Sequence, residues 1–112
     1  MTSPRILPSV DANNERRIKV FIVVHHTITD PETAFARGQN LLAGNDAPPS
    51  VRVREFYPSR DKADVVCLWE GNSLEEVRDY VDATLADSSQ NAYFEVDTDI
   101  ARGLPELAVS RA

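Results

Sequence analysis

Residues 18–28 read IKVFIVVHHTI, and this stretch decides the fold because it is the clearest strand in the chain. Val, Ile and Phe favour extended backbone, and an uninterrupted apolar run is typical of a buried strand. The run ends in His25 and His26, the only two histidines of the chain. Neighbouring residues of a strand point to opposite faces. The two imidazoles therefore cannot easily bind one metal ion while the strand stays regular.

The segment that follows this strand, TDPETAFARGQNLLAG at 29–44, has the pattern of a helix. Thr29 or Asp30 is suited to cap its start, and Pro31 fits the first helical turn. Gly44 is a suitable terminator, because glycine readily adopts the left-handed conformation that ends many helices. The loop NDAPPS at 45–50 then prevents the helix from continuing, since proline breaks helices.

Three further strands and a second helix are predicted from the rest of the chain. Strands are indicated at 51–57 (VRVREFY), 64–70 (DVVCLWE) and 92–97 (AYFEVD). Apolar residues recur at helical spacing in LEEVRDYVDATL, and Ser73 with Glu76 forms the sequence pattern of a capping box before it.

The resulting β-α-β-β-α-β order is that of the ferredoxin-like split motif. We therefore expect an α+β domain whose four-stranded antiparallel sheet has the order 4-1-3-2, with both helices on one face. In placing side chains we take the adjacent first and third strands to run parallel. The domain is assigned to 17–100, after a mobile arm at 1–16 and before a tail at 101–112. An arm that folds over a neighbouring subunit is the alternative for 1–16.

Composition narrows the class of protein. The chain has 112 residues and a formal net charge of −6, which suggests one domain without the positive surface of a nucleic-acid binder. No apolar run approaches the ~20 residues of a membrane span, and the first residues lack the apolar segment of a signal peptide. Cys67 is the only cysteine, so no internal disulfide is expected. We expect a cytoplasmic protein that binds neither nucleic acid nor membrane.

Alternation along each strand assigns residues to the two faces of the sheet. In the first strand, Val20, Ile22 and Val24 are assigned to the helix side. Val66 and Leu68 of the third strand, and Phe94 and Val96 of the fourth, are also assigned to it. The open face is then expected to carry Phe21, Val23, His25, Val65, Cys67, Trp69, Tyr93 and Glu95.

The second strand allows two arrangements. A regular strand would place Arg52, Arg54 and Phe56 on the open face. A β-bulge would reverse its later part and place Glu55 and Tyr57 there instead.

An open face of this composition is too apolar to be left in water. The simplest cover is a second copy of the sheet related by a two-fold axis, which gives a homodimer. Two such sheets can enclose a cavity with apolar walls and a few polar groups, the usual construction of a small-molecule site.

This order of elements and this open face resemble the dimeric α+β barrel superfamily. The stretch VVCLWEGNSLEEVRDYV at 65–81 is similar to the small bacterial nickel-binding family within it. The resemblance implies the fold and a homodimer. The superfamily also contains cofactor-free monooxygenases, lactone isomerases, polyketide cyclases and heme enzymes, and the resemblance does not select one reaction.

With the first and third strands parallel, His25, Trp69 and Tyr93 are expected to cluster at one end of the barrel, with Glu95 one step further in. Imidazole is the usual general base near neutral pH, and a phenol can donate a hydrogen bond to a developing oxyanion. We predict catalytic roles for His25, Tyr93 and Glu95, in proton transfer on a carbonyl-bearing or phenolic small molecule, as in isomerisation, cyclisation or oxygenation. The predicted substrate-binding residues are Phe21, Arg52, Arg54, Cys67 and Trp69.

The alternatives remain open at this stage. No cofactor or metal is predicted; if a metal is present, His25 and Glu95 are its expected ligands. The protein would then be a nickel-like metal binder, or a small-ligand binder without turnover. A third alternative is a dimerisation domain in which Trp69 is core or interface packing and Cys67 a buried, inert thiol.

Overall fold

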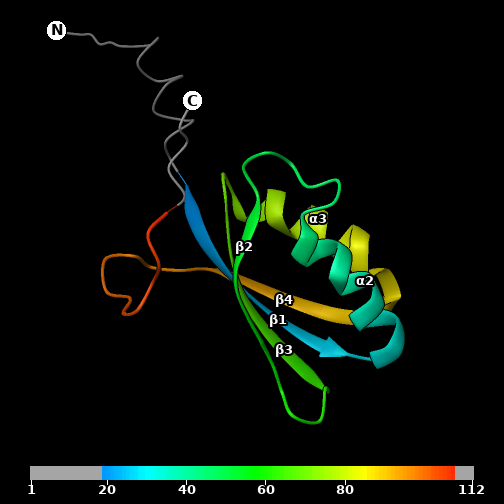
Figure 1. Ribbon diagram of the computed structural model, residues 1–112. Helices are drawn as coiled ribbons and strands as arrows, with labels where there is room; N and C mark the ends of the chain where they lie inside the picture. Colours follow the sequence, from blue (N-terminus) through cyan, green and yellow to red (C-terminus); the bar gives the residue numbers. More distant parts are fainter. Residues whose placement is uncertain (1–18, 108–112) are drawn as a thin grey trace, which may run out of the picture.

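The computed structural model describes residues 19–107 of the chain (Figure 1). The arm predicted at 1–16, and residues 108–112 of the predicted tail, lie outside these described residues. Within them the elements are β1 (Val20–Ile28), α2 (Pro31–Ala43), β2 (Arg52–Pro58), β3 (Asp64–Gly71), α3 (Leu74–Leu85), the 3-10 turn η1 (Ala86–Ser88) and β4 (Ser89–Glu95).

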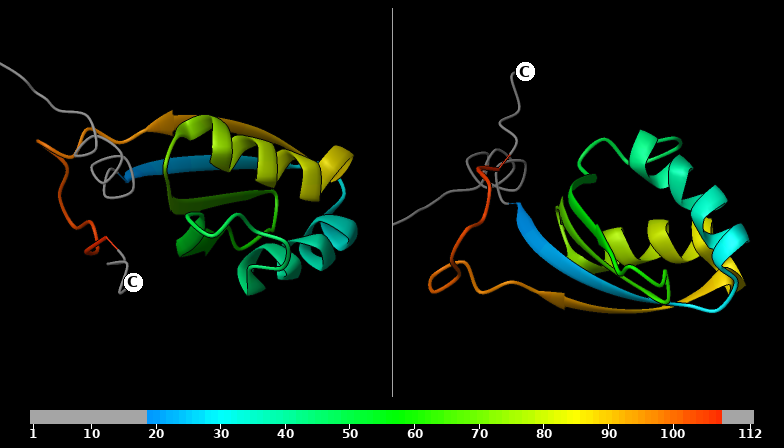
Figure 2. Two further views of the ribbon diagram at one scale, coloured as in Figure 1. Left: turned by 90° about the horizontal axis from the view of Figure 1, so that it is seen from above. Right: turned by 60° about the horizontal axis from the view of Figure 1, so that its bottom comes forward.

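The strands of this described part form one antiparallel sheet in the order β2-β3-β1-β4. Both helices cover one face of the sheet, and the other face is not covered by a helix (Figure 2). The β-α-β-β-α-β order and the sheet order confirm the predicted ferredoxin-like fold.

Both helix starts follow from capping side chains. The Asp30 carboxylate accepts a hydrogen bond from the backbone N–H of Thr33 at 3.3 Å at the start of α2, and the Ser73 hydroxyl accepts one from Glu76 at 3.1 Å at the start of α3. The expected capping box is only half formed, because the Glu76 carboxylate accepts from the backbone of Asn72 at 3.0 Å. Helix α2 ends at Gly44, whose φ of 77° is in the left-handed region.

The relative direction of the first and third strands was predicted wrongly. β1 and β3 are antiparallel, with Ile22 opposite Trp69 and His25 opposite Val66. The crossover through α2 makes β2 run in the same direction as β1, and β3 folds back on β2 as its hairpin partner. β3 must therefore run opposite to both, which places His25 and Trp69 toward different ends of the sheet.

The faces predicted for β3 and β4 are also inverted. Val24 faces the helices as expected, and it lies opposite Cys67 on β3 and Tyr93 on β4. Residues directly opposite each other share a face. Because β3 is apolar on both faces, alternation alone could not decide its phase, and a one-residue change of register inverts every assignment. The helix side carries Val65, Cys67, Trp69, Tyr93 and Glu95, and the open side carries Val66, Leu68 and Phe94.

Strand β2 contains the bulge considered above. Its pairing with β3 shifts between Val53 and Glu55. After the shift, Tyr57 lies opposite Val66 on the open face, and Phe56 lies opposite Cys67 on the helix side. The bulged arrangement is therefore the correct one of the two.

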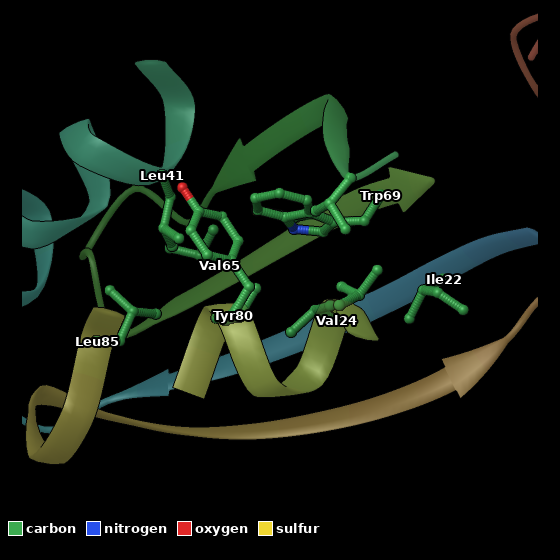
Figure 3. Packing of buried hydrophobic residues seen from close by; sticks show 11 residues of the cluster. Ile22, Val24, Leu41, Val65, Trp69, Tyr80 and Leu85 are labelled. Atoms are coloured by element: carbon green, nitrogen blue, oxygen red, sulfur yellow. The ribbon is translucent and has the colours of Figure 1, made fainter. Parts of the chain in front are cut away.

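The core lies between the sheet and the helices, and Trp69 is at its centre (Figure 3). Its ring meets Tyr80 of α3 edge to face, with ring centroids 6.1 Å apart. Helix α3 packs on β1, β3 and β4, whereas α2 packs mainly on α3. Helix α2 consequently leaves space between itself and the sheet.

The open face is partly covered at the end where β1 begins. The chain returns there after β4 (Figure 1), and Val96 donates a backbone hydrogen bond to Phe21 at 2.8 Å. Arg54 joins this segment to the sheet, since its guanidinium contacts the buried Glu70 carboxylate at 2.6 Å and the backbone oxygen of Glu106 at 2.6 Å. Lys19 lies 3.9 Å from the same carboxylate.

Candidate functional site

The three residues predicted to be catalytic do not meet. His25 is exposed on the open face, where its Nε2 lies 2.9 Å from the Asp64 carboxylate. Tyr93 and Glu95 share the helix side of the sheet, opposite Val24 and Ile22. The sheet itself therefore separates the imidazole from the other two side chains.

The predicted substrate-binding residues are divided in the same way. Phe21, Arg52 and Arg54 belong to the open face, and Arg54 is engaged by Glu70. Cys67 and Trp69 face the helices and are buried. These two belong to a different site from the one predicted.

The geometry also separates the two residues expected to bind a metal, if one is present, because His25 and Glu95 lie on opposite faces. Within residues 19–107, no group of three or more His, Cys, Asp or Glu side chains is placed to hold a metal ion.

A cavity of about 210 Å³ lies between α2 and the sheet, in the space that α2 leaves. Its walls come from the two central strands, β1 and β3, and from β2 and α2. Most of them are aliphatic or aromatic, and Leu42 and Phe56 are partly exposed. The lining residues are His26, Ile28, Ala34, Phe35, Gly38, Gln39, Leu41, Leu42, Phe56, Val65, Cys67, Trp69 and Leu85.

Trp69, one of the lining residues, has an unsatisfied donor that is not accessible from the cavity. The indole N–H of Trp69 is buried and makes no hydrogen bond in the described part of the chain. It lies near the Cys67 thiol, where it lowers the pKa of Cys67 and opposes the larger effect of burial. Buried polar groups are almost always hydrogen-bonded, and this donor is an exception within residues 19–107.

His26 is a buried polar side chain of the wall, and only 3% of its surface is exposed. Its Nδ1 lies 2.8 Å from Asn91 Oδ1. That oxygen also accepts from the Ser89 hydroxyl at 2.8 Å, and the amide nitrogen of Asn91 donates to Asp82 at 2.9 Å. Oδ1 is thus an acceptor, and Nδ1 of His26 must carry the proton.

This hydrogen-bond chain defines the state of the imidazole. Burial lowers the pKa of His26, and the nearby His25 adds to the effect, while Asn91 and Asp82 oppose it. A neutral ring protonated on Nδ1 leaves Nε2 as an acceptor. Nε2 points away from Asn91, and it makes no hydrogen bond within residues 19–107.

Tyr93 supports this chain rather than the cavity. Its hydroxyl donates to Asp82 at 2.6 Å, on the same oxygen that receives the Asn91 amide. Burial and the neighbouring carboxylate raise the pKa of Tyr93. The phenol stays protonated and helps to hold Asp82 in place.

Cys67 matches the alternative of a buried, inert thiol. Burial raises its pKa to about 12, and a thiol in this state is a poor nucleophile at neutral pH. We assign it to the cavity wall.

The structure places His26, and not His25, in the cavity wall, and the sequence contained a signal for this placement. His26 is in phase with Ile22 and Val24, which were correctly assigned to the helix side. Asn91 and Asp82 had no such signal, because they belong to different elements and meet only in the folded protein.

No family model, no curated protein and no solved structure matches this chain. Within residues 19–107, no helix has the length and apolar character needed to cross a bilayer.

Proposed function

We propose that this protein binds a small, largely apolar molecule in the cavity between α2 and the sheet. The cavity itself carries the proposal, because about 210 Å³ of space lined mostly by aliphatic and aromatic side chains is large enough for a molecule of one small ring. The mixture of apolar walls with a few polar groups is typical of small-molecule sites.

The same cavity suits the proton transfer considered from the sequence, with His26 in the role first given to His25. Nε2 of a neutral His26 would take a proton from a carbon or oxygen of the ligand. The electron pair left behind would move onto a ligand oxygen. The imidazolium would then return the proton to another atom of the ligand, which completes an isomerisation without a cofactor.

Binding is tested through Trp69, which is the only tryptophan of the chain. We expect its fluorescence, excited at 295 nm, to change saturably on titration with toluene and phenol as probes. Gly38→Leu places a side chain at the cavity and should abolish the change while the circular dichroism spectrum is retained. Phe94→Ser, on the other face of the sheet, is the matched control and should titrate normally. Equal titration of the Gly38→Leu variant and the wild type would contradict the assignment.

Turnover is a separate question from binding. His26→Gln keeps a polar side chain in the wall but removes the base. If the protein is an enzyme, this variant should lose proton exchange between an enolisable ketone and D₂O, as followed by NMR, while it still binds toluene. Absence of exchange in the wild type would leave a ligand-binding protein without turnover.

We further propose that the open face pairs with a second copy of the chain. Tyr57 and Phe94 are both more than half exposed there (59% and 58%), and Val66 is 39% exposed. Val23 lies opposite Phe94, and Tyr57 lies opposite Val66, so all four side chains belong to the same face of the sheet. Apolar patches of this kind favour self-association.

Sedimentation equilibrium measures this association directly. Phe94→Ser should shift the protein toward the monomer. Ile100→Ser removes an apolar side chain that is even more exposed (72%) but lies outside the sheet, and it should leave the mass unchanged. A monomeric wild type at 100 µM would exclude the homodimer.

A further inference from the structure

We infer that the ligand of the cavity carries an unbranched aliphatic chain, which lies beneath α2 and extends into a second cavity. This inference rests on the proposed binding function and adds the chemical class of the ligand. It follows from the adjacency of the two cavities, from their length along α2 and from the side chains that line them.

The second cavity, of about 180 Å³, lies beneath the end of α2 and the loop that follows this helix. Leu41, Leu42 and Trp69 line this cavity as well as the first one. The two cavities therefore adjoin, and the three shared side chains mark the boundary between them. The remaining lining residues of the second cavity are Ala43, Gly44, Ala47, Val51, Arg52 and Val53.

Together the two cavities follow α2 and β3 over most of the length of these elements. On α2, the lining residues run from Ala34 in the first cavity to Ala43 in the second, a rise of about 14 Å along the helix axis. On β3 they run from Val65 to Trp69, which is about 13 Å of strand. A ligand that fills both cavities is therefore long rather than round.

The boundary between the cavities favours a narrow hydrocarbon. Leu41 and Trp69 are buried there, whereas Leu42 is 43% exposed, and an exposed side chain changes rotamer readily. An unbranched chain is the narrowest hydrocarbon, so it passes between such side chains more easily than a ring does. Beyond the boundary, most side chains of the second cavity are aliphatic. Burial of methylene groups against them is favourable.

The volume of the first cavity sets the chain length at which the second cavity is needed. An apolar cavity of about 150 Å³ is known to accept benzene, which has six carbon atoms. In the same proportion, the first cavity of about 210 Å³ accepts roughly eight carbon atoms. We therefore expect 1-hexanol to fit in the first cavity alone, whereas 1-decanol has to extend into the second.

Titration of the wild-type protein with these two alcohols tests the inference, and toluene serves as a probe of the first cavity. Trp69 lines both cavities and is the only tryptophan of the chain, so its fluorescence reports on either one. Burial of each additional methylene group should lower the dissociation constant about fourfold. We expect the dissociation constant of 1-decanol to be at least tenfold lower than that of 1-hexanol.

Two variants fill the second cavity and locate the end of the chain. Ala47 and Val53 line the second cavity but not the first. Ala47→Leu should bind toluene and 1-hexanol as the wild type does, but it should lose the additional affinity for 1-decanol. Val53→Leu should have the same effect from the side of the sheet, so the test does not depend on the folding of one variant. Ala36→Leu is the matched control, because Ala36 is exposed on α2 and lines neither cavity.

The outcomes separate the two proposals. If neither toluene nor either alcohol binds, the proposed binding function is wrong, and the inference falls with it. If toluene binds but 1-decanol binds no more tightly than 1-hexanol, the first cavity is a binding site and the inferred ligand class is wrong. The inference is also wrong if the variants that fill the second cavity keep the full preference for 1-decanol. A tenfold preference that these variants lose and Ala36→Leu keeps supports the inference.

Discussion

Replacing Gly38 by alanine should stabilise this protein, and the same replacement at Gly71 should destabilise it. Gly38 lies in the interior of α2, at the cavity, and a Cβ atom there would meet no atom within 4 Å. Gly71 ends β3, and a Cβ atom there would lie 2.9 Å from Cγ2 of Val77, a fully buried side chain of α3. The two sites thus differ in the space that surrounds them.

The expected magnitudes follow from this difference. In both variants alanine reduces the backbone freedom of the unfolded chain, which is worth about 0.5–1 kcal/mol. At Gly38 nothing opposes this gain, so the melting temperature should rise by about 2–8 °C. At Gly71 the gain is offset by overpacking, which typically costs about 1–3 kcal/mol. The difference between the two variants isolates this native-state cost.

Urea unfolding followed by circular dichroism measures both values. Loss of stability in Gly38→Ala would mean that the space between α2 and the sheet is already filled and that no cavity exists there. Equal stabilisation of both variants would show that the contact between β3 and α3 is looser than described.

Three other predictions concern the buried polar groups and the helix caps. Because burial lowers the pKa of His26, the unfolded chain binds a proton at a pH at which the folded protein does not. The stability of the folded protein should therefore fall as the pH drops below about 6.5. Urea titrations between pH 7.5 and 5.5 should show that His26→Leu makes the stability less dependent on pH. Arg54→Met removes the closest ion-pair partner of the buried Glu70 carboxylate and should cost about 3 kcal/mol, whereas the exposed Arg52→Met should change the unfolding midpoint little. Ser73→Ala removes the cap of α3 and should cost about 1 kcal/mol by thermal denaturation, a loss that Ser73→Asp should largely avoid.

Much of the fold was predictable because its signals are local. The apolar run ending at His25 and His26, the caps at Asp30 and Ser73, and the terminator Gly44 each act within a few residues. Their order along the chain is enough to indicate the ferredoxin-like arrangement. The bulge of β2 was also foreseen as one of two arrangements, because alternation fails within that strand.

The site was not predictable to the same degree, because it depends on phase and direction. A strand that is apolar on both faces, such as VVCLW at 65–69, can pack with either face toward the helices, so its composition does not decide which face is buried. Only its pairing with β1 places Cys67 opposite Val24. This choice moved Trp69 from the expected open face to the core and separated His25 from Tyr93.

The sequence by itself therefore determined which segments are strands and helices, the order in which they follow one another, and the helix-facing phase of β1. Hydrophobic periodicity and capping act over a few residues, so they are visible in the sequence alone. Only the tertiary structure decided the direction and register of β3 and β4 and the distance of α2 from the sheet. It also decided the hydrogen-bond chain that joins His26, Asn91 and Asp82. These features depend on hydrogen bonds and packing between residues far apart in the chain, and a shift of one residue in register moves a side chain from one face of the sheet to the other.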